Sequence, residues 1–203
     1  MIAKGLQQNQ LHNSCEYLLL IKPHQELCNK IMFIKEQFSK KYNTSLSIYE
    51  KPNITLLRYK QLEILEEKII NHLQNTAREY APFKVELRNF GNYPTHSIYI
   101  NIESKQQVKN LIKEIRSVQR VMKFDKFNKP HFLDNPNIAI AGKLLPWQYE
   151  KAWLEYSNLE FTGRFMANSM SLLKRKEGEG FKFLRKFEFL NIPVTTKQGD
   201  LFM

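Results

Sequence analysis

Two short segments of the chain carry the same pattern of polar and apolar side chains. The first reads PNITL around Asn53, and the second reads PNIAI around Asn137. Side chains alternate between the two faces of a strand, so Thr55 would share a face with Asn53, and Ala139 with Asn137. Amide and hydroxyl groups on one face can donate and accept hydrogen bonds. A polar residue in the same register of two strands therefore predicts a two-fold binding site.

Each segment begins a predicted strand within the same order of elements, which is strand, helix, motif strand, helix. In the first half the apolar periodicity predicts strand 15–22, helix 24–43, strand 53–59 and a helix through 62–73. In the second half it predicts strand 97–102, helix 108–118, strand 137–144 and helix 146–157. The repeated order favours duplication of one unit over a chance similarity of a few residues.

The remaining predicted strands make the expected fold class α+β. Residues 83–88 alternate strictly and pair with 97–102 as a hairpin, and two late strands are predicted over 161–173 and 181–190. Hairpins imply antiparallel pairing, so we expect two pseudo-symmetric lobes with one motif strand each. The expected organisation is a loose segment over 1–14, one bilobal domain over 15–192 and a tail over 193–203.

The composition predicts a globular protein with an anionic partner or a lysine-rich surface. The 203 residues are 42% hydrophobic and 25% charged, which suits one substantial core. The net charge of +11 favours nucleotides, RNA or phosphate esters as partners, and a solvated lysine-rich surface is the alternative. Neither a signal peptide nor a membrane span is recognisable, and Cys15 and Cys28 are typical of free thiols. We therefore expect a cytoplasmic protein with no membrane partner.

These motifs and their surroundings resemble the 2H phosphoesterase superfamily, which includes bacterial 2′-5′ RNA ligase-like proteins and cyclic nucleotide phosphodiesterases. In that family, two His-x-(Thr/Ser)-apolar motifs face each other across a groove between two lobes. The resemblance extends from about Cys15 to Ile192. It implies antiparallel sheets flanking a central groove with helices outside. It also implies no metal or other cofactor, and a nucleotide or RNA partner with a phosphate or cyclic phosphate end. The sequence leaves the oligomeric state open, with a monomer favoured.

The chain departs from the family pattern at the positions that carry its chemistry. Asn53 and Asn137 stand where the resemblance places the two histidines, and Ala139 replaces the second hydroxyl, so that only Thr55 remains. An amide cannot exchange a proton near neutral pH, whereas an imidazole can. General acid or base catalysis contributes about 10²- to 10⁴-fold per group. The sequence therefore predicts a degenerate site that binds a nucleotide or RNA-end phosphate but is catalytically impaired.

Other readings remain open at this stage. Natural degeneration, a deliberate double substitution and a chemistry that uses amides are all compatible with the two asparagines. A residually active RNA-end or 2′,3′-cyclic phosphate phosphodiesterase or ligase would need a replacement acid or base, for which His131 is the best candidate. A protein-interaction module that uses the groove is a further alternative. Three other histidines are expected elsewhere: His24 on the surface or capping a helix, His72 solvated and His96 on the hairpin.

Three cationic or titratable side chains are candidates for holding a phosphate beside Thr55. Arg58 is three residues after Thr55, which predicts the opposite face of the strand. Lys143 is six residues after Asn137 and is predicted to share its face. His131 precedes the second motif on a loop that can approach the groove.

The loop KFDKFNKPHF (residues 123–132) mixes lysines with phenylalanines. Such a mixture suits nucleic-acid binding through charge and base stacking. The preferred alternative is a solvated loop whose aromatic side chains anchor it to the core. Trp147 and Trp153 are predicted to lie in the core because of their helical spacing against Tyr149 and Leu154.

Overall fold

The chain folds as an α+β structure in the computed structural model, which describes residues 14–44, 51–123 and 129–192. The expected loose segment over 1–14 lies outside these ranges except for Ser14, which already belongs to the first strand. The expected tail over 193–203 lies outside them entirely. No helix in the described ranges has the length and apolar character needed to cross a membrane.

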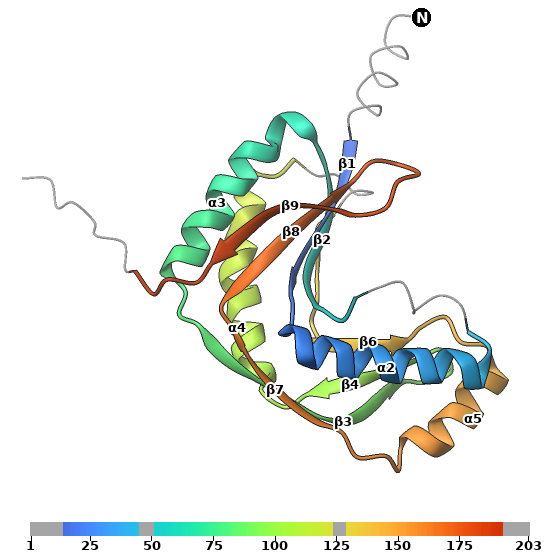
Figure 1. Cartoon of the computed structure of the whole chain (residues 1–203). Helices are drawn as coiled ribbons and strands as arrows, with labels where there is room; N and C mark the ends of the chain where they lie inside the picture. The colour runs from blue at the N-terminus through green and yellow to red at the C-terminus, as the bar shows by residue number, and fades with distance from the viewer. Residues whose placement is uncertain (1–13, 45–50, 124–128, 193–203) are drawn as a thin grey trace, which may run out of the picture.

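The strands of the described residues form two antiparallel sheets (Figure 1). Sheet A has the strand order β5-β2-β1-β8-β9, and sheet B has the order β6-β4-β3-β7. Their bounds are β1 Ser14–Ile21, β2 Ile54–Leu62, β3 Phe83–Tyr93, β4 Ser97–Ile102, β5 His131–Phe132, β6 Asn137–Ala141, β7 Thr162–Ala167, β8 Ser169–Arg175 and β9 Lys182–Glu188. Antiparallel pairing throughout confirms the expected α+β class.

The helices follow the repeated order that the sequence predicts. Their bounds are α2 Gln25–Tyr42, α3 Glu66–Glu79, α4 Lys105–Ile115 and α5 Pro146–Tyr156, with short 3₁₀ helices η1 Glu63–Leu65 and η2 Arg116–Val121. The first half runs β1-α2-β2-α3, and the second half runs β4-α4-β6-α5 with the two-residue strand β5 inserted before β6. The predicted order of strand, helix, motif strand and helix is therefore confirmed in both halves.

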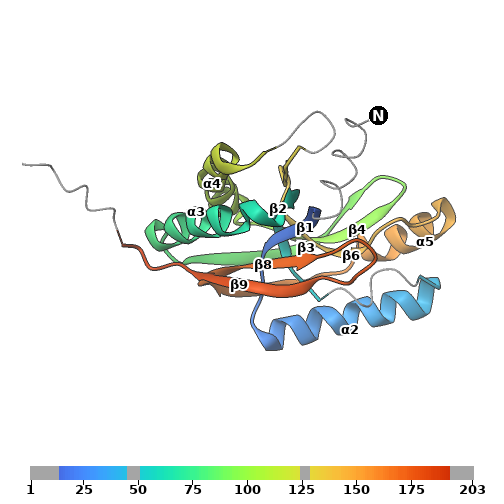
Figure 2. The same ribbon diagram turned by 90° about the horizontal axis from the view of Figure 1, so that it is seen from above.

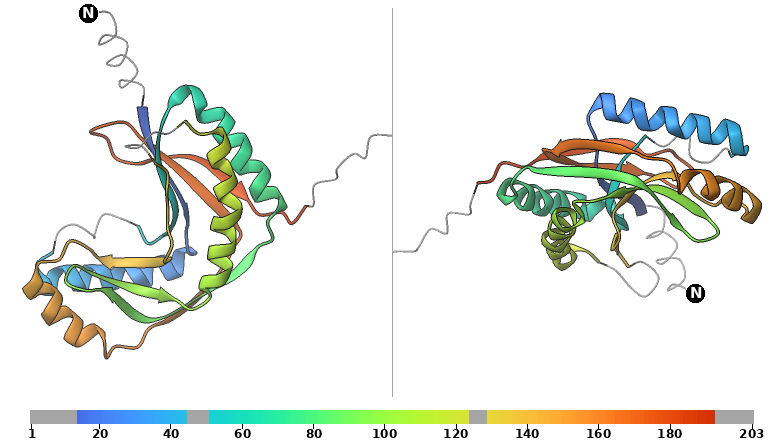
Figure 3. Two further views of the ribbon diagram at one scale, coloured as in Figure 1. Left: turned by 180° about the vertical axis from the view of Figure 1, so that it is seen from behind. Right: turned by 90° about the horizontal axis from the view of Figure 1, so that it is seen from below.

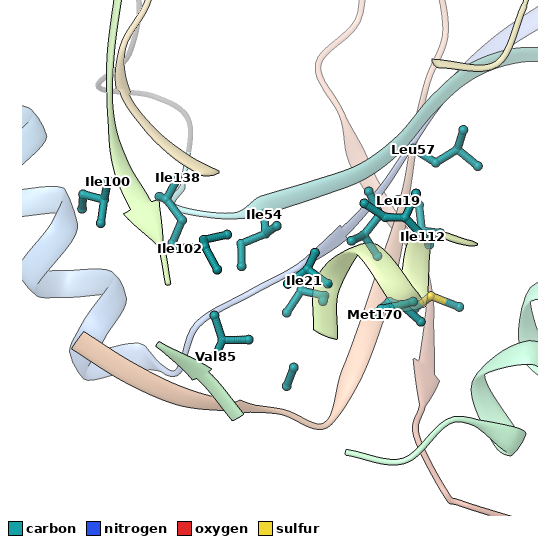
Figure 4. Close-up of a cluster of buried hydrophobic side chains, with 14 of the residues drawn as sticks. Leu19, Ile21, Ile54, Leu57, Val85, Ile100, Ile102, Ile112, Ile138 and Met170 are labelled. Carbon is teal, nitrogen blue, oxygen red and sulfur yellow. The ribbon is translucent and has the colours of Figure 1, made fainter. Parts of the chain in front are cut away.

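The first helix of each half packs on the sheet of the other half. α2, which follows β1 of sheet A, contacts β6 and β7 of sheet B. α4, which follows β4 of sheet B, contributes Ile112 to a buried cluster that includes Leu19 and Met170 of sheet A (Figure 4). Figures 2 and 3 show α3 and α4 together on one side of the sheets and α2 on the opposite side. The two halves are thus interlocked through one core.

The apolar residue after each motif asparagine lies in this core. Ile54 of β2 and Ile138 of β6 are fully buried, and both belong to the cluster drawn in Figure 4. Since strand side chains alternate, burial of these isoleucines directs Thr55 and Ala139 to the other face of each sheet. The core therefore determines which way the motif side chains point.

The long helix α2 begins and ends at residues that satisfy its terminal backbone groups. Nδ1 of His24 accepts a hydrogen bond from the N–H of Leu27 at 3.4 Å, which confirms the predicted capping role. At the other end, Asn43 adopts a left-handed φ of 50°, and its N–H donates to the carbonyl of Ser39. Asparagine tolerates this conformation better than most residues.

The late strand predicted over 161–173 is two strands that belong to different sheets. β7 pairs with β3 in sheet B, and β8 pairs with β1 in sheet A. The buried positions change parity between them, from Phe165 and Ala167 to Met170 and Leu172. The break falls at Asn168, whose carbonyl accepts a hydrogen bond from the N–H of Phe189. The prediction of one continuous strand was wrong because the alternation shifts by one residue at this point.

The two tryptophans of α5 do not share one environment. Trp153 is partly buried and packs against the core, as predicted. Trp147 is 49% exposed, so its predicted place in the core was wrong. The buried stripe of α5 runs through Gln148, Ala152 and Tyr156 at helical spacing, and Trp147 lies beside that stripe.

Candidate functional site

The two motif strands begin near each other at the junction of the sheets. Cα atoms of β2 and β6 approach within 8 Å. β5 runs antiparallel beside β2, and after it the N–H of Leu133 donates to the carbonyl of Leu56 at 3.1 Å. The chain then reaches Asn137, at which β6 begins, while Asn53 immediately precedes β2. The fold therefore brings both motif asparagines to one region from two different sheets.

The side chain of Asn53 is held by its own segment of chain. Its Nδ2 donates to the carbonyl of Lys51 at 2.9 Å, and its Oδ1 accepts from the hydroxyl of Thr55 at 3.2 Å. Asn53 and Thr55 are both partly buried. The predicted placement of these two side chains on one face is consistent with this direct contact.

The side chain of Asn137 repeats one of these contacts and adds another. Its Nδ2 donates to the carbonyl of Asn135 at 3.0 Å, two residues earlier, as the amide of Asn53 does. The same Nδ2 donates to the hydroxyl of Tyr93 at 3.1 Å, and Asn135 donates to that hydroxyl at 3.3 Å. Ala139, two residues after Asn137, is exposed and offers no polar group. The second motif thus relies on Tyr93 where the first has Thr55.

Arg58 lies on the same face of sheet A as Thr55, contrary to the prediction. In the pairing of β1 with β2, Leu19 faces Leu57 and Leu20 faces Thr55, so Leu56 is the extra residue of a β-bulge. The bulge inverts the alternation, and Arg58 follows it on the face of Thr55. The simple count of three residues failed because a bulge shifts the register by one.

A bulge in β6 also affects Lys143, which was predicted to share a face with Asn137. In the pairing of β4 with β6, Ile98 faces Ala141 and Tyr99 faces Ala139, so Ile140 is the extra residue. β6 ends at Ala141, and Lys143 is exposed in a left-handed turn with φ 54°. The predicted sharing of a face, argued from even spacing along one strand, was therefore wrong.

His131 lies on a strand and not on a loop. It pairs with Arg58 across β5 and β2, so both side chains project from the same face, and His131 is exposed. The next residue, Phe132, is buried, with the guanidinium of Arg116 4.7 Å from its ring. Residues 124–128 of the predicted basic, aromatic loop lie outside the described residues. Within the described part of that loop, Phe132 serves as the anchor that the alternative reading expected.

His72 and His96 are two further histidines within the described ranges. His96 is an exposed hairpin residue whose Nδ1 is 2.9 Å from the carbonyl of Pro94, as expected of a hairpin position. His72 was expected to be solvated, but it is partly buried and its Nε2 is 2.8 Å from the hydroxyl of Ser117. Neither contacts a motif asparagine among the described interactions.

A charged cluster lies near Arg58 on the same face of sheet A. Glu16 on β1 accepts from Arg58 at 3.0 Å through one carboxylate oxygen and from Nε of Arg175 on β8 at 2.7 Å through the other. The ring of Phe181 lies 5.8 Å from the Arg58 guanidinium and 4.5 Å from that of Arg175. Sequence reasoning missed Glu16, Arg175 and Phe181 because no local pattern links the three segments that carry them.

Aromatic side chains cover the corresponding face of sheet B. Tyr93 and Tyr99 lie on adjacent strands with ring centroids 4.9 Å apart. A Cβ at Gly91 would lie 2.5 Å from the Tyr99 ring, so only glycine leaves room for this ring. Burial raises the pKa of Tyr99. Tyr93 accepts a hydrogen bond from Asn137 and was also missed by sequence reasoning. Its position in a hairpin does not indicate that its side chain reaches β6.

Two surface pockets among the described residues are lined by residues other than the motif asparagines. One is lined by side chains of β3 and β7, including Arg88 and Arg164. The other, of about 500 Å³, is lined by Glu16, Lys60, Arg175 and the hairpin residues 176–179. The motif side chains therefore line neither of these two pockets, whereas the charged cluster of sheet A contributes to the second.

Comparison with known proteins gives one family and a consistent fold. A family model described as the 2′-5′ RNA ligase superfamily matches residues 26–179, which is more than half of the chain. No curated protein matches the chain significantly.

Solved structures share the fold at low sequence identity. TT0787 of Thermus thermophilus has a TM-score of 0.64 and 14% identity, with 86% of this chain and 98% of that chain covered. E. coli LigT in apo form has a TM-score of 0.62 and 13% identity, with 87% and 98% covered. LigT complexed with 3′-AMP has a TM-score of 0.60 and 12% identity, again with 87% and 98% covered. At these identities the likeness concerns the fold alone.

Proposed function

This chain belongs to the 2′-5′ RNA ligase superfamily, and we propose that its motif strands bind the phosphate of a nucleotide or RNA end with little or no turnover. The observation that carries the proposal is the matched geometry of Asn53 and Asn137. Each amide donates to the carbonyl two residues earlier, at 2.9 Å and 3.0 Å. Two side chains held in the same way at the start of the two motif strands make a preorganised polar pair.

The chemistry of this pair favours binding over catalysis. An amide donates and accepts hydrogen bonds but does not take up or release a proton near neutral pH. Loss of a general acid or base typically lowers the rate by about 10²- to 10⁴-fold, and two such groups act as a unit. Thr55 remains as a hydroxyl donor for a phosphate oxygen, and Arg58 provides a cation on the same face.

A relative with a similar fold supports the class of ligand. Structures of E. coli LigT hold 3′-AMP, ATP and phosphate. These ligands share a phosphate group, and the net charge of +11 favours such anions in this chain as well.

The test is to restore titratable groups at the two positions. We expect the unmodified protein to bind 3′-AMP in calorimetry but to leave a panel of 2′,3′-cyclic nucleotides and short 2′-5′-linked RNAs intact. The double variant Asn53→His, Asn137→His should hydrolyse at least one of them, by on the order of 10²-fold over the unmodified protein or more. Adding Ala139→Thr supplies the second hydroxyl and should raise the rate further.

The matched control is the double variant Asn29→His, Asn110→His, which adds two histidines at exposed helix positions. It should behave as the unmodified protein does. Turnover by the unmodified protein would show that the site is not degenerate. Absence of both binding and turnover in all variants would leave the family likeness as one of fold alone.

Residual activity is the second candidate function, and the position of His131 favours it. His131 is exposed beside Arg58, on the face of sheet A that carries Thr55. If this imidazole replaces a lost acid or base, His131→Gln should abolish turnover by the unmodified protein and change its pH–rate profile. His72→Gln is the control, because that side chain lies on α3 and contacts Ser117 rather than a residue of the motif strands. Equal rates for both variants would exclude His131 from the reaction.

A further inference from the structure

The face of sheet A that carries Thr55, called the open face here, extends from β5 to β9 in three rows of paired residues. Paired residues on adjacent antiparallel strands project from the same side of the sheet. Following the pairing from strand to strand, the rows are Thr55–Leu20–Ser171–Lys186, His131–Arg58–Leu18–Leu173–Phe183, and Lys60–Glu16–Arg175. The motif hydroxyl and the edge strand β9 are thus joined by one continuous face.

Cations outnumber carboxylates on the described part of the open face. Four basic side chains, Arg58, Lys60, Arg175 and Lys186, project from it together with two acidic ones, Glu16 and Glu188. Lysines on an edge strand also discourage pairing with other chains, and that role would account for Lys186 on β9. It does not account for Arg58 on β2 or Arg175 on β8, because both strands are paired on each side.

Aromatic rings accompany these cations. Phe183 lies in the row of Arg58 and His131 and is 61% exposed. Phe181 already has the guanidinium groups of Arg58 and Arg175 at 5.8 Å and 4.5 Å from its ring. Leu18 and Leu20, in the middle of the face, are buried, so the solvent-facing groups are those of the flanking strands. Exposed rings with nearby cations are what non-specific single-strand binding requires.

From this arrangement we infer that the open face binds a single-stranded oligonucleotide of several residues that leads away from the motif strands toward β9. A base stacks on Phe183, and backbone phosphates contact Arg175 and Lys186. The inference rests on the proposed function in taking a phosphate at the motif strands as one end of the ligand.

The extent of the face sets the expected length of the ligand. β2 and β9 are separated by three strand spacings, which amounts to about 14 Å. A stacked single strand rises about 3.4 Å per nucleotide, so roughly four nucleotides cover this distance. The pocket lined by Glu16, Lys60 and Arg175 lies in the third row, so it flanks this path on the side away from Thr55. A mononucleotide at the motif strands would not reach Phe183.

The experiment compares fluorescein-labelled oligouridylates of one and four nucleotides, each with a 3′-phosphate, by anisotropy with the full chain. The tetranucleotide should bind roughly 5- to 100-fold more tightly than the mononucleotide, because stacking of a base on an aromatic ring contributes this much. Phe183→Ala should remove most of that gain and leave mononucleotide binding unchanged. Lys186→Gln should lower the slope of log affinity against log salt by about 0.7.

Phe33→Ala is the matched control, because Phe33 is 62% exposed on α2 and differs from Phe183 in place alone. A poly-glutamate peptide of matched charge serves as an anionic polymer without bases. Equal affinity for both oligouridylates, or equal effects of the two phenylalanine variants, overturns the inference, as does equally tight binding of the peptide. In those cases the mononucleotide still binds and the proposed function stands. If the mononucleotide also fails to bind, the proposed function fails as well.

Discussion

Leu56 and Ile140 occupy equivalent places in the two halves of the protein. Each is the extra residue of a β-bulge, and each lies three residues after its motif asparagine. Both side chains are fully buried. A bulge bends its strand and is retained where a side chain must be aimed. The matching bulges therefore support duplication of one unit more strongly than the repeated letters do.

The buried side chain of Leu56 is expected to contribute to the stability of the protein. Leu56→Ala should lower the free energy of unfolding by about 2–5 kcal/mol, since it removes a buried side chain from close-packed surroundings. Urea unfolding at neutral pH measures the change. Ile64→Ala, at a side chain that is 83% exposed, should stay within about 0.5 kcal/mol. A loss at Leu56 as small as that at Ile64 would contradict the packing described for this strand.

Gly91 is expected to be the position most sensitive to an added methyl group near the second motif. In Gly91→Ala, the new Cβ would lie 2.5 Å from the Tyr99 ring and 2.6 Å from Oδ1 of Asn101. Such overpacking typically costs about 1–3 kcal/mol. The midpoint temperature of thermal unfolding and the affinity for 3′-AMP should both fall. A Cβ at Gly180 would have nothing within 4 Å, so Gly180→Ala should change neither quantity. Equal effects of the two variants would contradict the expected clash at Gly91.

Tyr93→Phe tests the hydrogen bonds that hold Asn137. It removes the hydroxyl that accepts from Asn137 and Asn135, at an expected cost of about 0.5–1.5 kcal/mol per bond. Tyr149→Phe is the control, because its hydroxyl bonds Asn92 at 3.1 Å, away from the motif. Both variants should lose stability in urea unfolding, but Tyr93→Phe alone should weaken 3′-AMP binding. Unchanged binding in Tyr93→Phe would mean that Asn137 does not need this partner.

The stability of the protein should fall in acid through Glu63, which contacts Lys174. Nζ of Lys174 is 2.8 Å from Glu63 and 2.6 Å from Glu66. The hydrogen bond and charge of Lys174 hold the pKa of Glu63 below its ordinary value of 4.5. Because the pKa is lower in the folded chain than in the unfolded chain, this stabilisation is complete above about pH 4.5. It is lost as the pH falls through the lowered folded-state value.

Lys174→Met should therefore destabilise the protein near neutral pH by roughly 1–3 kcal/mol and reduce the further loss in acid. Urea unfolding from about pH 7 to about pH 3 measures both effects. Lys186→Met is the control, since its pair with Glu188 is exposed on both sides. An unchanged acid dependence in Lys174→Met would assign the pH sensitivity to other groups.

Local pattern was sufficient to predict the elements that the core requires. Apolar alternation and helical spacing predicted the hairpin of β3 and β4, the helices α2 to α5 and the repeated order of both halves. The faces of Asn53 and Thr55 followed from period-two alternation within one short stretch. These features depend on neighbours along the chain, so they could be inferred without knowledge of the tertiary structure.

Position beyond a bulge or a sheet change could not be predicted in this way. The places of Arg58 and Lys143 were wrong because Leu56 and Ile140 each add a residue that no local pattern marks. The strand over 161–173 was wrong because the chain changes sheets at Asn168. A single inserted residue reverses the face of every side chain that follows it within the strand.

The sequence by itself determined the elements, their repeated order and the polar residues that open each motif strand. Only the tertiary structure decided which side chains those residues meet. Tyr93 reaches Asn137 from a hairpin, Glu16 joins Arg58 to Arg175, and Phe183 shares a face with Thr55 through four paired strands. The physical reason is that secondary structure follows from short-range periodicity, whereas a binding surface follows from the register of strands that are distant along the chain.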